Sequence, residues 1–194
     1  MPEKIDLYKL HKADYVAPKD PVLVRIGAAK YLTVEGQGEP GGEMFQSMLG
    51  ALYGAAYTIK MTKKFAGQDY KVCGLEGLWW GFEGARETWR WKLLIRVPDF
   101  LAARDLKDAV ARLKEKGKGD LPAQVRLETI KEGRSVQALH VGPYSTEPAT
   151  VERMKAFAEA SGLSLRGPHH EIYLSDPRRV APEKLRTILR FPVE

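Results

Sequence analysis

Glu171 lies in the short run H-H-E-I-Y-L, residues 169–174, which offers the most chemistry in the chain. In a strand, alternation would place His169, Glu171 and Tyr173 on one face. A half-buried carboxylate beside a tyrosine attracts a cation, or its pKa rises until it can act as a general acid or base. An exposed glutamate on a solvated sheet face fits the spacing equally well. Glu171 is the first candidate catalytic residue, with Tyr173 and His169 as candidate substrate-binding neighbours.

A second glutamate, Glu76, occupies a similar position in the first half of the chain, within G-L-E-G-L-W-W. Alternation would put Glu76 and Trp80 on one face and leave Trp79 on the other, under a helix as a core residue. Flat aromatic surface beside carboxylates is typical of sites for planar or cationic ligands. Glu76 and Trp80 therefore join the candidate substrate-binding residues, together with Trp89 on the neighbouring predicted strand.

Tyr144 follows Gly142 and Pro143, at the point where a predicted strand breaks. A phenol in that place can donate or accept a hydrogen bond at the rim of a site. A turn tyrosine that only packs against its neighbours is the alternative. We take Tyr144 as the second candidate catalytic residue.

Metal and nucleophile motifs are missing from the sequence. His169 and His170 would point to opposite faces of a strand, and no H-E-x-x-H spacing is present. Cys73 is the only cysteine, which excludes an intramolecular disulfide and a cysteine-built metal site. No G-x-S-x-G elbow and no phosphate-binding loop occur. We expect no metal and no cofactor.

The elements that must position these residues occur as two similar copies in the sequence. V-E-G-Q-G-E-P near Val34 is echoed by V-G-P-Y-S-T-E-P near Val141, and I-R-V-P is echoed by L-R-F-P. Each copy predicts the order β-α-β-β, because apolar residues alternate in the strands and recur every three or four residues in the helices. We predict strands at 21–26, 30–34, 70–82, 88–97, 125–130, 135–141, 169–174 and 185–191, and helices at 43–63, 100–116 and 147–160.

This order predicts an α+β fold of two duplicated β-α-β-β units related by a pseudo-two-fold axis. We expect two antiparallel sheets, each covered on one face by a helix, and a ligand groove between the units. The predicted organisation is an N-terminal extension at 1–20 and a single domain at 21–194. Within that domain the first unit spans about 21–98, a connecting helix 99–122, and the second unit 123–194.

Composition bounds the function classes further. The 194 residues carry a formal net charge of +6, but the basic residues are scattered and no nucleic-acid-binding signature is present. We expect no direct nucleic acid binding. There is no signal peptide and no apolar run long enough to span a bilayer, so we expect a cytoplasmic protein without membrane contact. The sequence leaves open whether the chain is a monomer or a homodimer.

Two longer segments, H-V-G-P-Y-S-T-E-P and H-H-E-I-Y-L-S-D-P-R-R, together with L-W-W, carry a family resemblance from about residue 20 to the end. The chain resembles the GyrI-like small-molecule-binding family, and within it the stand-alone proteins that lack a DNA-binding domain. The resemblance implies a groove in which a buried glutamate, matched by Glu171, binds lipophilic cations among aromatic residues.

Some stand-alone members resemble hydrolases that open the strained ring of DNA-alkylating cyclopropanoid compounds. The resemblance implies a glutamate with tyrosine and tryptophan neighbours, for which Glu171, Tyr144, Tyr173 and Trp80 are the candidates. It thus predicts a protein that binds planar, lipophilic or cationic aromatic compounds and hydrolyses electrophilic cyclopropanoids for detoxification. The alternatives are a non-catalytic multidrug-binding module and an interaction protein similar to a DNA gyrase inhibitor.

Overall fold

The computed structural model describes residues 4–81 and 84–194. Within this part of the chain, four α-helices and six antiparallel strands form an α+β fold. The first half contains α1 (Leu7–Leu10), β1 (Val22–Gln37), α2 (Glu43–Phe65), β2 (Glu76–Trp80) and β3 (Arg90–Arg96). The rest contains α3 (Ala103–Glu115), β4 (Arg126–Val141), α4 (Glu147–Ala160), β5 (His169–Tyr173) and β6 (Arg186–Pro192). The predicted strand end at Phe82 lies outside the described residues.

The six strands form one closed barrel in the order β1-β3-β2-β5-β6-β4. This corrects the expectation of two separate sheets. The order β-α-β-β does occur on both sides of α3, but β1 pairs with β4 and β2 pairs with β5, so the two halves share one sheet. The β2–β5 pairing brings Glu171 directly beside the tryptophan strand of the first half.

Strands β1 and β4 are longer than expected, since each was predicted as two short strands. They pair in a single register from Val22 opposite Gln137 to Thr33 opposite Arg126, with a break only at Gly27. Gly133, with φ of 74°, adopts the left-handed conformation that glycine tolerates without a steric penalty. Its turn-like signature therefore does not end β4, and the long bent strand closes the barrel.

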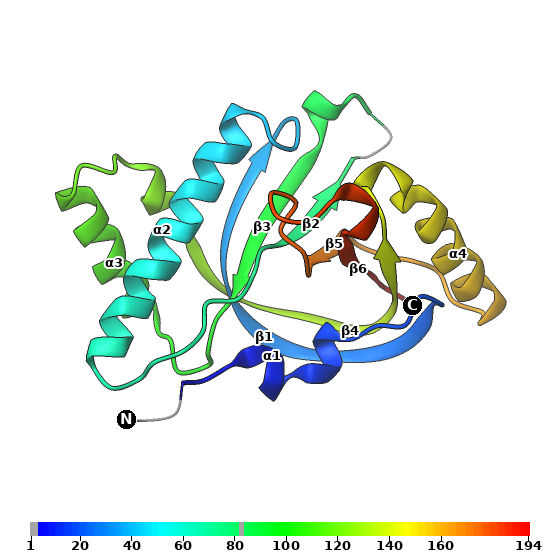
Figure 1. The fold of residues 1–194 in the computed structure, drawn as a ribbon, viewed down its shortest axis with the longest axis horizontal. Helices are drawn as coiled ribbons and strands as arrows, with labels where there is room; N and C mark the ends of the chain where they lie inside the picture. The colour runs from blue at the N-terminus through cyan, green and yellow to red at the C-terminus, as the bar shows by residue number, and fades with distance from the viewer. Residues whose placement is uncertain (1–3, 82–83) are drawn as a thin grey trace.

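Helices cover the outer face of the barrel on two sides (Figure 1). The predicted apolar stripe of α2, including Met48, Leu52 and Ile59, is buried in a large cluster with residues of β1 and β3. Helix α3 packs on α2, while Met154 and other residues of α4 pack on β4 and β6. The sheet surface formed by β2 and β5 is thus flanked by α2 and α4.

The N-terminal segment, predicted as an extension, packs closely on the barrel. After α1 it forms a short 3-10 turn, Lys12–Tyr15, in which Tyr15 is buried. Tyr15 contacts Ile172 of β5 and Ile188 of β6 in a small apolar cluster. Among the described residues, no helix has the length and apolar character needed to cross a bilayer.

Candidate functional site

The two faces of β5 carry different groups, and the register with β2 shows which groups meet. Gly77 lies opposite Glu171, and Trp79 lies opposite His169. Alternation then gives β5 an outer face with His169, Glu171 and Tyr173, as predicted, and an inner face with His170 and Ile172. This five-residue strand therefore places polar side chains both on the outer surface, next to the helices, and in the barrel interior.

A chain of hydrogen bonds leads from β2 to the Glu171 carboxylate. The Tyr173 hydroxyl donates to Glu171 Oε2 at 2.6 Å, and Trp79 Nε1 donates to the Tyr173 oxygen at 3.1 Å. The Trp79 ring in turn stacks on Phe45 of α2, with ring centroids 6.1 Å apart. Tyr173 and Trp79 therefore hold one oxygen of the carboxylate and favour its ionised form.

Gly77 creates the space for this arrangement. A Cβ atom at residue 77 would lie 2.7 Å from Trp79 Nε1 and 3.2 Å from the Tyr173 hydroxyl. The first distance is shorter than a Cβ atom tolerates and the second is tight, so a larger residue would displace the Trp79 indole and press on the Tyr173 hydroxyl. On the outer face of β2, the position that pairs with Glu171 therefore carries no side chain.

Glu147, the first residue of α4, supplies a second carboxyl group to this surface. It is buried, and its Oε1 has no hydrogen-bond partner among the described residues. It lies close enough to Glu171 for each carboxyl to alter the ionisation of the other. We call Glu147 and Glu171 the carboxyl pair.

The carboxyl pair holds a proton near neutral pH. Burial raises the pKa of Glu147 to about 9, and the adjacent charge of Glu171 adds to the effect. Burial also raises the pKa of Glu171 to about 7, although the Tyr173 hydrogen bond and the charge of His170 oppose it. Two like charges this close in a low-dielectric site cannot both ionise readily. Because Tyr173 donates to Glu171, we assign the first negative charge to Glu171.

Tyr144 and His169 complete the surroundings. The Tyr144 ring meets the Tyr173 ring edge-on at 5.9 Å, and Tyr144 remains 40% exposed. Burial and the charges of the carboxyl pair raise the pKa of Tyr144 to about 12, so its hydroxyl stays a donor. His169 Nδ1 lies 3.9 Å from Glu171 Oε1, and burial lowers the pKa of His169 to about 3, which keeps the ring neutral. We call the carboxyl pair with Trp79, Tyr144, His169 and Tyr173 the outer cluster.

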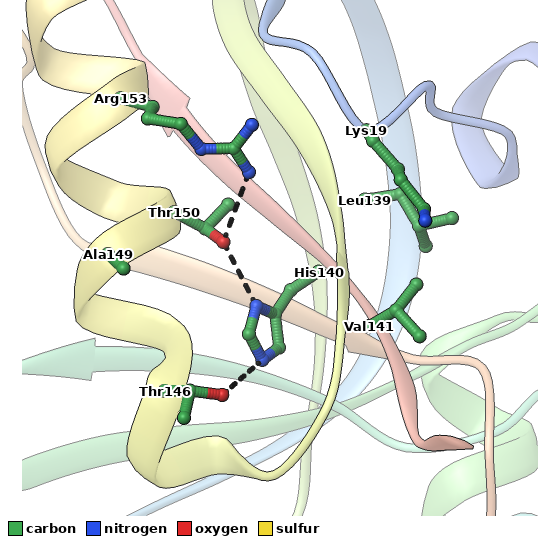
Figure 2. A pocket seen from close by; sticks show the side chains of 8 residues that line it. All are labelled: Lys19, Leu139, His140, Val141, Thr146, Ala149, Thr150 and Arg153. Carbon is green, nitrogen blue, oxygen red and sulfur yellow. Dashed lines mark hydrogen bonds between the residues drawn. The ribbon is translucent and has the colours of Figure 1, made fainter. Parts of the chain in front are cut away.

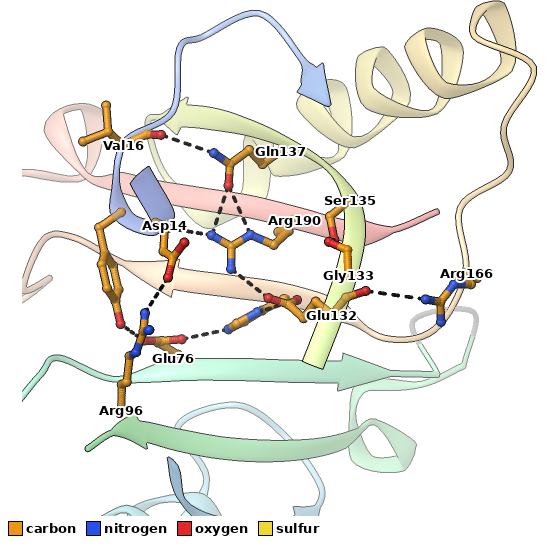
Figure 3. A network of polar contacts seen from close by, with 12 residues as sticks. Asp14, Val16, Glu76, Arg96, Glu132, Gly133, Ser135, Gln137, Arg166 and Arg190 are labelled. Carbon is orange, nitrogen blue, oxygen red and sulfur yellow. Dashed lines mark hydrogen bonds and ion pairs between the residues drawn. The ribbon is translucent and has the colours of Figure 1, made fainter. Parts of the chain in front are cut away.

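On the inner face, His170 belongs to a different set of buried polar residues, of which Figure 3 labels Glu76, Glu132 and Arg190. Its Nε2 is 3.1 Å from Glu76 Oε2, and its Nδ1 is 2.8 Å from Glu132 Oε1. Tyr15 donates to the other Glu76 oxygen at 3.0 Å, and Arg190 donates to Glu132 Oε2 at 2.7 Å. We call Tyr15, Glu76, Glu132, His170 and Arg190 the inner network.

Charges in the inner network are paired. Burial lowers the pKa of His170, but the flanking carboxylates outweigh it and raise that pKa to about 9. Burial acts the other way on Glu132, where His170 and Arg190 prevail and lower the pKa to about 2. A protonated histidine and an arginine thus face two glutamates. Arg190 also reaches the Asp14 carbonyl at 2.6 Å, which ties the N-terminal segment to the barrel.

The structure brings five of the candidate site residues to one side of the sheet and separates two from them. Glu171, Tyr173, His169 and Tyr144 lie in the outer cluster. Trp89 lies beside that cluster, because its ring meets the Trp79 ring edge-on at 6.5 Å.

The expectation that Glu76 and Trp80 lie on the same face as Glu171 is wrong. Glu76 faces the barrel interior, and Trp80 packs there with Leu78 and Tyr31. Glu76 is one residue out of register with Glu171, and a single-residue offset in a strand reverses the face.

Sequence reasoning missed Glu147, Gly77 and the polar role of Trp79. Glu147 could have been found, because it precedes Val151 by four residues and Met154 by seven and therefore lies on the buried stripe of α4. A carboxyl group on a buried stripe needs a hydrogen-bonding or ionic partner. The position of Trp79 depended on the β2–β5 register, for which the sequence carries no local signal.

A cavity of about 260 Å³ lies next to the first turns of α4 (Figure 2). Its polar lining comes from Lys19, His140, Thr146, Thr150 and Arg153. It sits between the N-terminal segment, β4 and α4, so it is not the expected groove between two units. Among the described residues, no group of three or more histidine, cysteine or acidic side chains is placed to hold a metal ion.

Comparison with known proteins identifies the family. The model of the GyrI-like small molecule binding domain matches residues 19–194, and the chain therefore belongs to that family. The comparison with curated proteins gave no match. An uncharacterized conserved protein from Listeria innocua has a solved structure with a TM-score of 0.93 and 38% identity, covering 98% of this chain and 100% of that chain.

A second solved structure, of a hydrolase from Listeria innocua, has a TM-score of 0.91 and 39% identity. It covers 98% of this chain and 100% of that chain. The C-terminal domain of EcmrR has a TM-score of 0.60 at 14% identity, covering 90% of this chain and 97% of that chain. At this identity the likeness to EcmrR shows a common fold alone.

Proposed function

We propose that this protein hydrolyses planar aromatic compounds that carry a strained, electrophilic ring, with DNA-alkylating cyclopropanoids as the substrate class and detoxification as the role. The observation that carries the proposal is the carboxyl pair, a buried site that keeps one proton near neutral pH and has one carboxylate, Glu171, able to accept another. The likeness to a structure named as a hydrolase at 39% identity supports it.

The outer cluster suits the addition of water to a strained carbon. Glu171 removes a proton from the attacking water, a role for which a pKa of about 7 is well matched. The water oxygen bonds to a cyclopropane CH₂, and the bond between that carbon and the ring of the dienone breaks. The released electron pair restores aromaticity and moves to the carbonyl oxygen, which takes a proton from solvent and leaves a phenol. Glu171 then returns the proton it took from water to the solvent.

Tyr144 and Trp79 supply the other requirements. The Tyr144 hydroxyl keeps its proton and can donate to the carbonyl oxygen as its charge grows, which is the role of an oxyanion hole. Trp79 is buried and holds Tyr173 through its indole N–H, while the partly exposed ring of Trp89, which meets Trp79 edge-on, can pack on a flat ligand. Glu147, which stays protonated, prevents a second charge from building up beside the base.

The test is hydrolysis of a spirocyclopropyl cyclohexadienone by the purified protein. We expect loss of the dienone absorbance and a product heavier by one water, confirmed by mass spectrometry. The rate should rise about tenfold per pH unit below pH 7 and level off above it, because only ionised Glu171 acts as base. A rate equal to that in buffer alone would overturn the proposal.

Glu171→Gln and Glu147→Gln are matched variants, since each replaces one carboxyl of the pair with a neutral amide of the same shape. Glu171→Gln should lower kcat/KM by roughly 10²- to 10⁴-fold, the usual contribution of a general base. Glu147→Gln keeps the base and should retain most of the activity. Equal losses in both variants would contradict the assignment of Glu171 as the base.

Non-catalytic binding of aromatic cations is the second candidate. One observation favours it: among the described residues, neither carboxyl of the pair forms an ion pair with lysine or arginine. A bound cation would supply the missing charge. Tight binding without any product, and weakened by Glu171→Gln, would select this function over hydrolysis.

A further inference from the structure

We propose that the cavity of about 260 Å³ beside α4 binds a small organic phosphate, with its phosphate group between Lys19 and Arg153 (Figure 2). Lys19 comes from the N-terminal segment and Arg153 from α4, so the fold brings together two positive charges that are far apart in sequence. This binding site is separate from the outer cluster, and the proposal does not depend on the proposed function. We call it the α4 cavity.

The two cationic side chains have few strong partners within the protein. Lys19 is exposed and forms no ion pair among the described residues. Arg153 makes two long contacts, 3.7 Å to Asp20 Oδ1 and 3.4 Å to the Thr150 hydroxyl. The Asp20 side chain is 94% exposed, and an ion pair in such a setting contributes little. Because no described carboxylate lines the α4 cavity, its positive charge is available to an anion.

Buried polar side chains form the inner wall of the α4 cavity. His140 is 5% exposed and Thr150 is 4% exposed. His140 Nε2 lies 3.2 Å from the Pro143 carbonyl, which can only accept, so we assign a proton to Nε2. His140 Nδ1 then accepts from the Thr150 hydroxyl at 3.0 Å. These groups hold one another in place, which leaves the N–H groups of Arg153 to meet a ligand.

The edge of β4 adds a backbone donor to the same place. The Leu139 N–H donates at 2.7 Å to the Pro18 carbonyl of the N-terminal segment. N–H groups alternate between the two edges of a strand, so the Val141 N–H points to the same edge as that of Leu139. Strand β1 pairs with β4 only as far as Gln137, so this N–H lies beyond β1 and can donate to a ligand in the α4 cavity.

These donors and the size of the α4 cavity define the ligand. A guanidinium group binds phosphate oxygens through paired N–H groups, and an ammonium group adds a point charge, so together they suit a doubly charged phosphate. Apolar side chains of Leu139, Val141 and Ala149 line the remaining wall. A volume of about 260 Å³ exceeds the need of a bare ion, since one water molecule takes about 30 Å³. A phosphate monoester with a short apolar body therefore fits better than inorganic phosphate.

The experiment is calorimetric titration of the protein with phenyl phosphate at low, constant ionic strength. At about pH 8 a phosphate monoester carries close to two negative charges. Inorganic phosphate lacks the apolar body and should bind about 10-fold more weakly. Benzyl alcohol has the ring without the charge and should give no heat of binding.

Variants of exposed residues test the two cationic side chains without disturbing the core. Lys19→Met and Arg153→Met should each weaken binding of phenyl phosphate about 10-fold. Lys155→Met is the matched control, because it removes a charge from an exposed residue of α4 that does not line the α4 cavity, and it should change affinity less than about twofold. Asp20→Asn removes the competing carboxylate of Arg153 and should strengthen binding about 2- to 3-fold.

Glu171→Gln separates the α4 cavity from the outer cluster, and it should bind phenyl phosphate as tightly as the parent protein. Loss of binding in Glu171→Gln would place the ligand in the outer cluster and overturn the proposal. Equal affinities of Arg153→Met and Lys155→Met, or no binding at about 10 mM phenyl phosphate, would also overturn it. None of these results bears on hydrolysis, which the dienone assay measures separately.

Discussion

His170 and Glu171 are neighbours in sequence, yet they belong to opposite electrostatic environments. In the inner network, His170 sits between two carboxylates, and the acidic and basic charges are paired. In the outer cluster, Glu171 meets a second carboxyl and neutral donors only. A paired buried network stabilises one arrangement of the fold, whereas an unpaired buried carboxylate favours a proton or a ligand. Under the proposed function, the missing counter-charge rather than burial alone distinguishes Glu171 from the equally buried Glu132.

The largest expected effect is on the inner side. Arg190→Met leaves Glu132 buried with only His170 as a cationic partner, and should lower the free energy of unfolding by about 3–5 kcal/mol. Urea denaturation at pH 7 measures this. Arg166→Met is the control and should change little, because the Arg166 side chain donates only a long hydrogen bond of 3.5 Å to the Glu132 carbonyl among the described residues. A small change in the free energy of unfolding for Arg190→Met would contradict the view that paired charges of the inner network stabilise the fold.

In the outer cluster, by contrast, removing a charge should increase the free energy of unfolding. The pKa of Glu171 is raised in the folded protein, so the folded state binds more protons than the unfolded state, and stability falls as pH rises from about 4.5 towards 7. Glu171→Gln removes this cost and should raise the free energy of unfolding by about 1–3 kcal/mol at pH 8. At pH 4 the variant should match the parent protein. A loss of stability at pH 8 would show that Glu171 is a structural residue.

The inner histidine gives a pH dependence of its own. Since the pKa of His170 is raised to about 9 in the fold, its stabilising effect is complete below about 6.5 and is lost as pH rises through 9. Thermal melting between pH 6 and 10 should therefore show a decline that His170→Gln flattens. An unchanged slope in the variant would mean that His170 is not the charged link between Glu76 and Glu132.

Gly77 tests the fit between β2 and β5. Gly77→Ala should displace Trp79 Nε1 or the Tyr173 hydroxyl, cost about 1–3 kcal/mol of stability, and lower ligand affinity. Gly27→Ala in β1 is the matched control, because nothing lies within 4 Å of a Cβ atom there. Urea denaturation and the dienone assay together report the change. Similar behaviour of the two variants would argue against a tightly built outer cluster.

The smallest effect belongs to the hydrogen bond from the indole. Trp79→Phe keeps an aromatic ring on Phe45 but removes the donor to Tyr173, so the hydroxyl holds Glu171 less firmly. We expect a loss of about 0.5–1.5 kcal/mol in stability and a shift of the pH–rate profile to higher pH. Trp89→Phe is the control and should leave the profile in place. An unmoved profile for Trp79→Phe would exclude the indole from the site.

Much of this arrangement could be predicted from the sequence, because local patterns define it. The apolar stripes of α2 and α4 predicted both helices correctly. The alternation along β5 placed Glu171 on the same face as Tyr173 and His169. The closure into one barrel could not be predicted in this way. It depends on pairing between β1 and β4 and between β2 and β5, which are distant in sequence and set by three-dimensional packing.

The position of Glu76 was wrong for the same reason. The repeat suggested that Glu76 and Glu171 are equivalent, but the register places Gly77 opposite Glu171 and turns Glu76 inwards. Glu147 was overlooked although its place on the α4 stripe was readable. Its role as a partner of Glu171 can be recognised only once α4 is packed on β4 and β6, which brings the two carboxyl groups together.

Side-chain carboxyl titration by ¹³C NMR tests the central claim most directly, since it reads each glutamate separately. Variants assign the signals of Glu132, Glu147 and Glu171. The account predicts that Glu132 stays ionised down to about pH 2, whereas Glu171 and Glu147 take up protons near and above neutral pH. Titration of all three below pH 5 would contradict it, because the outer carboxyl pair would then hold no proton near neutral pH.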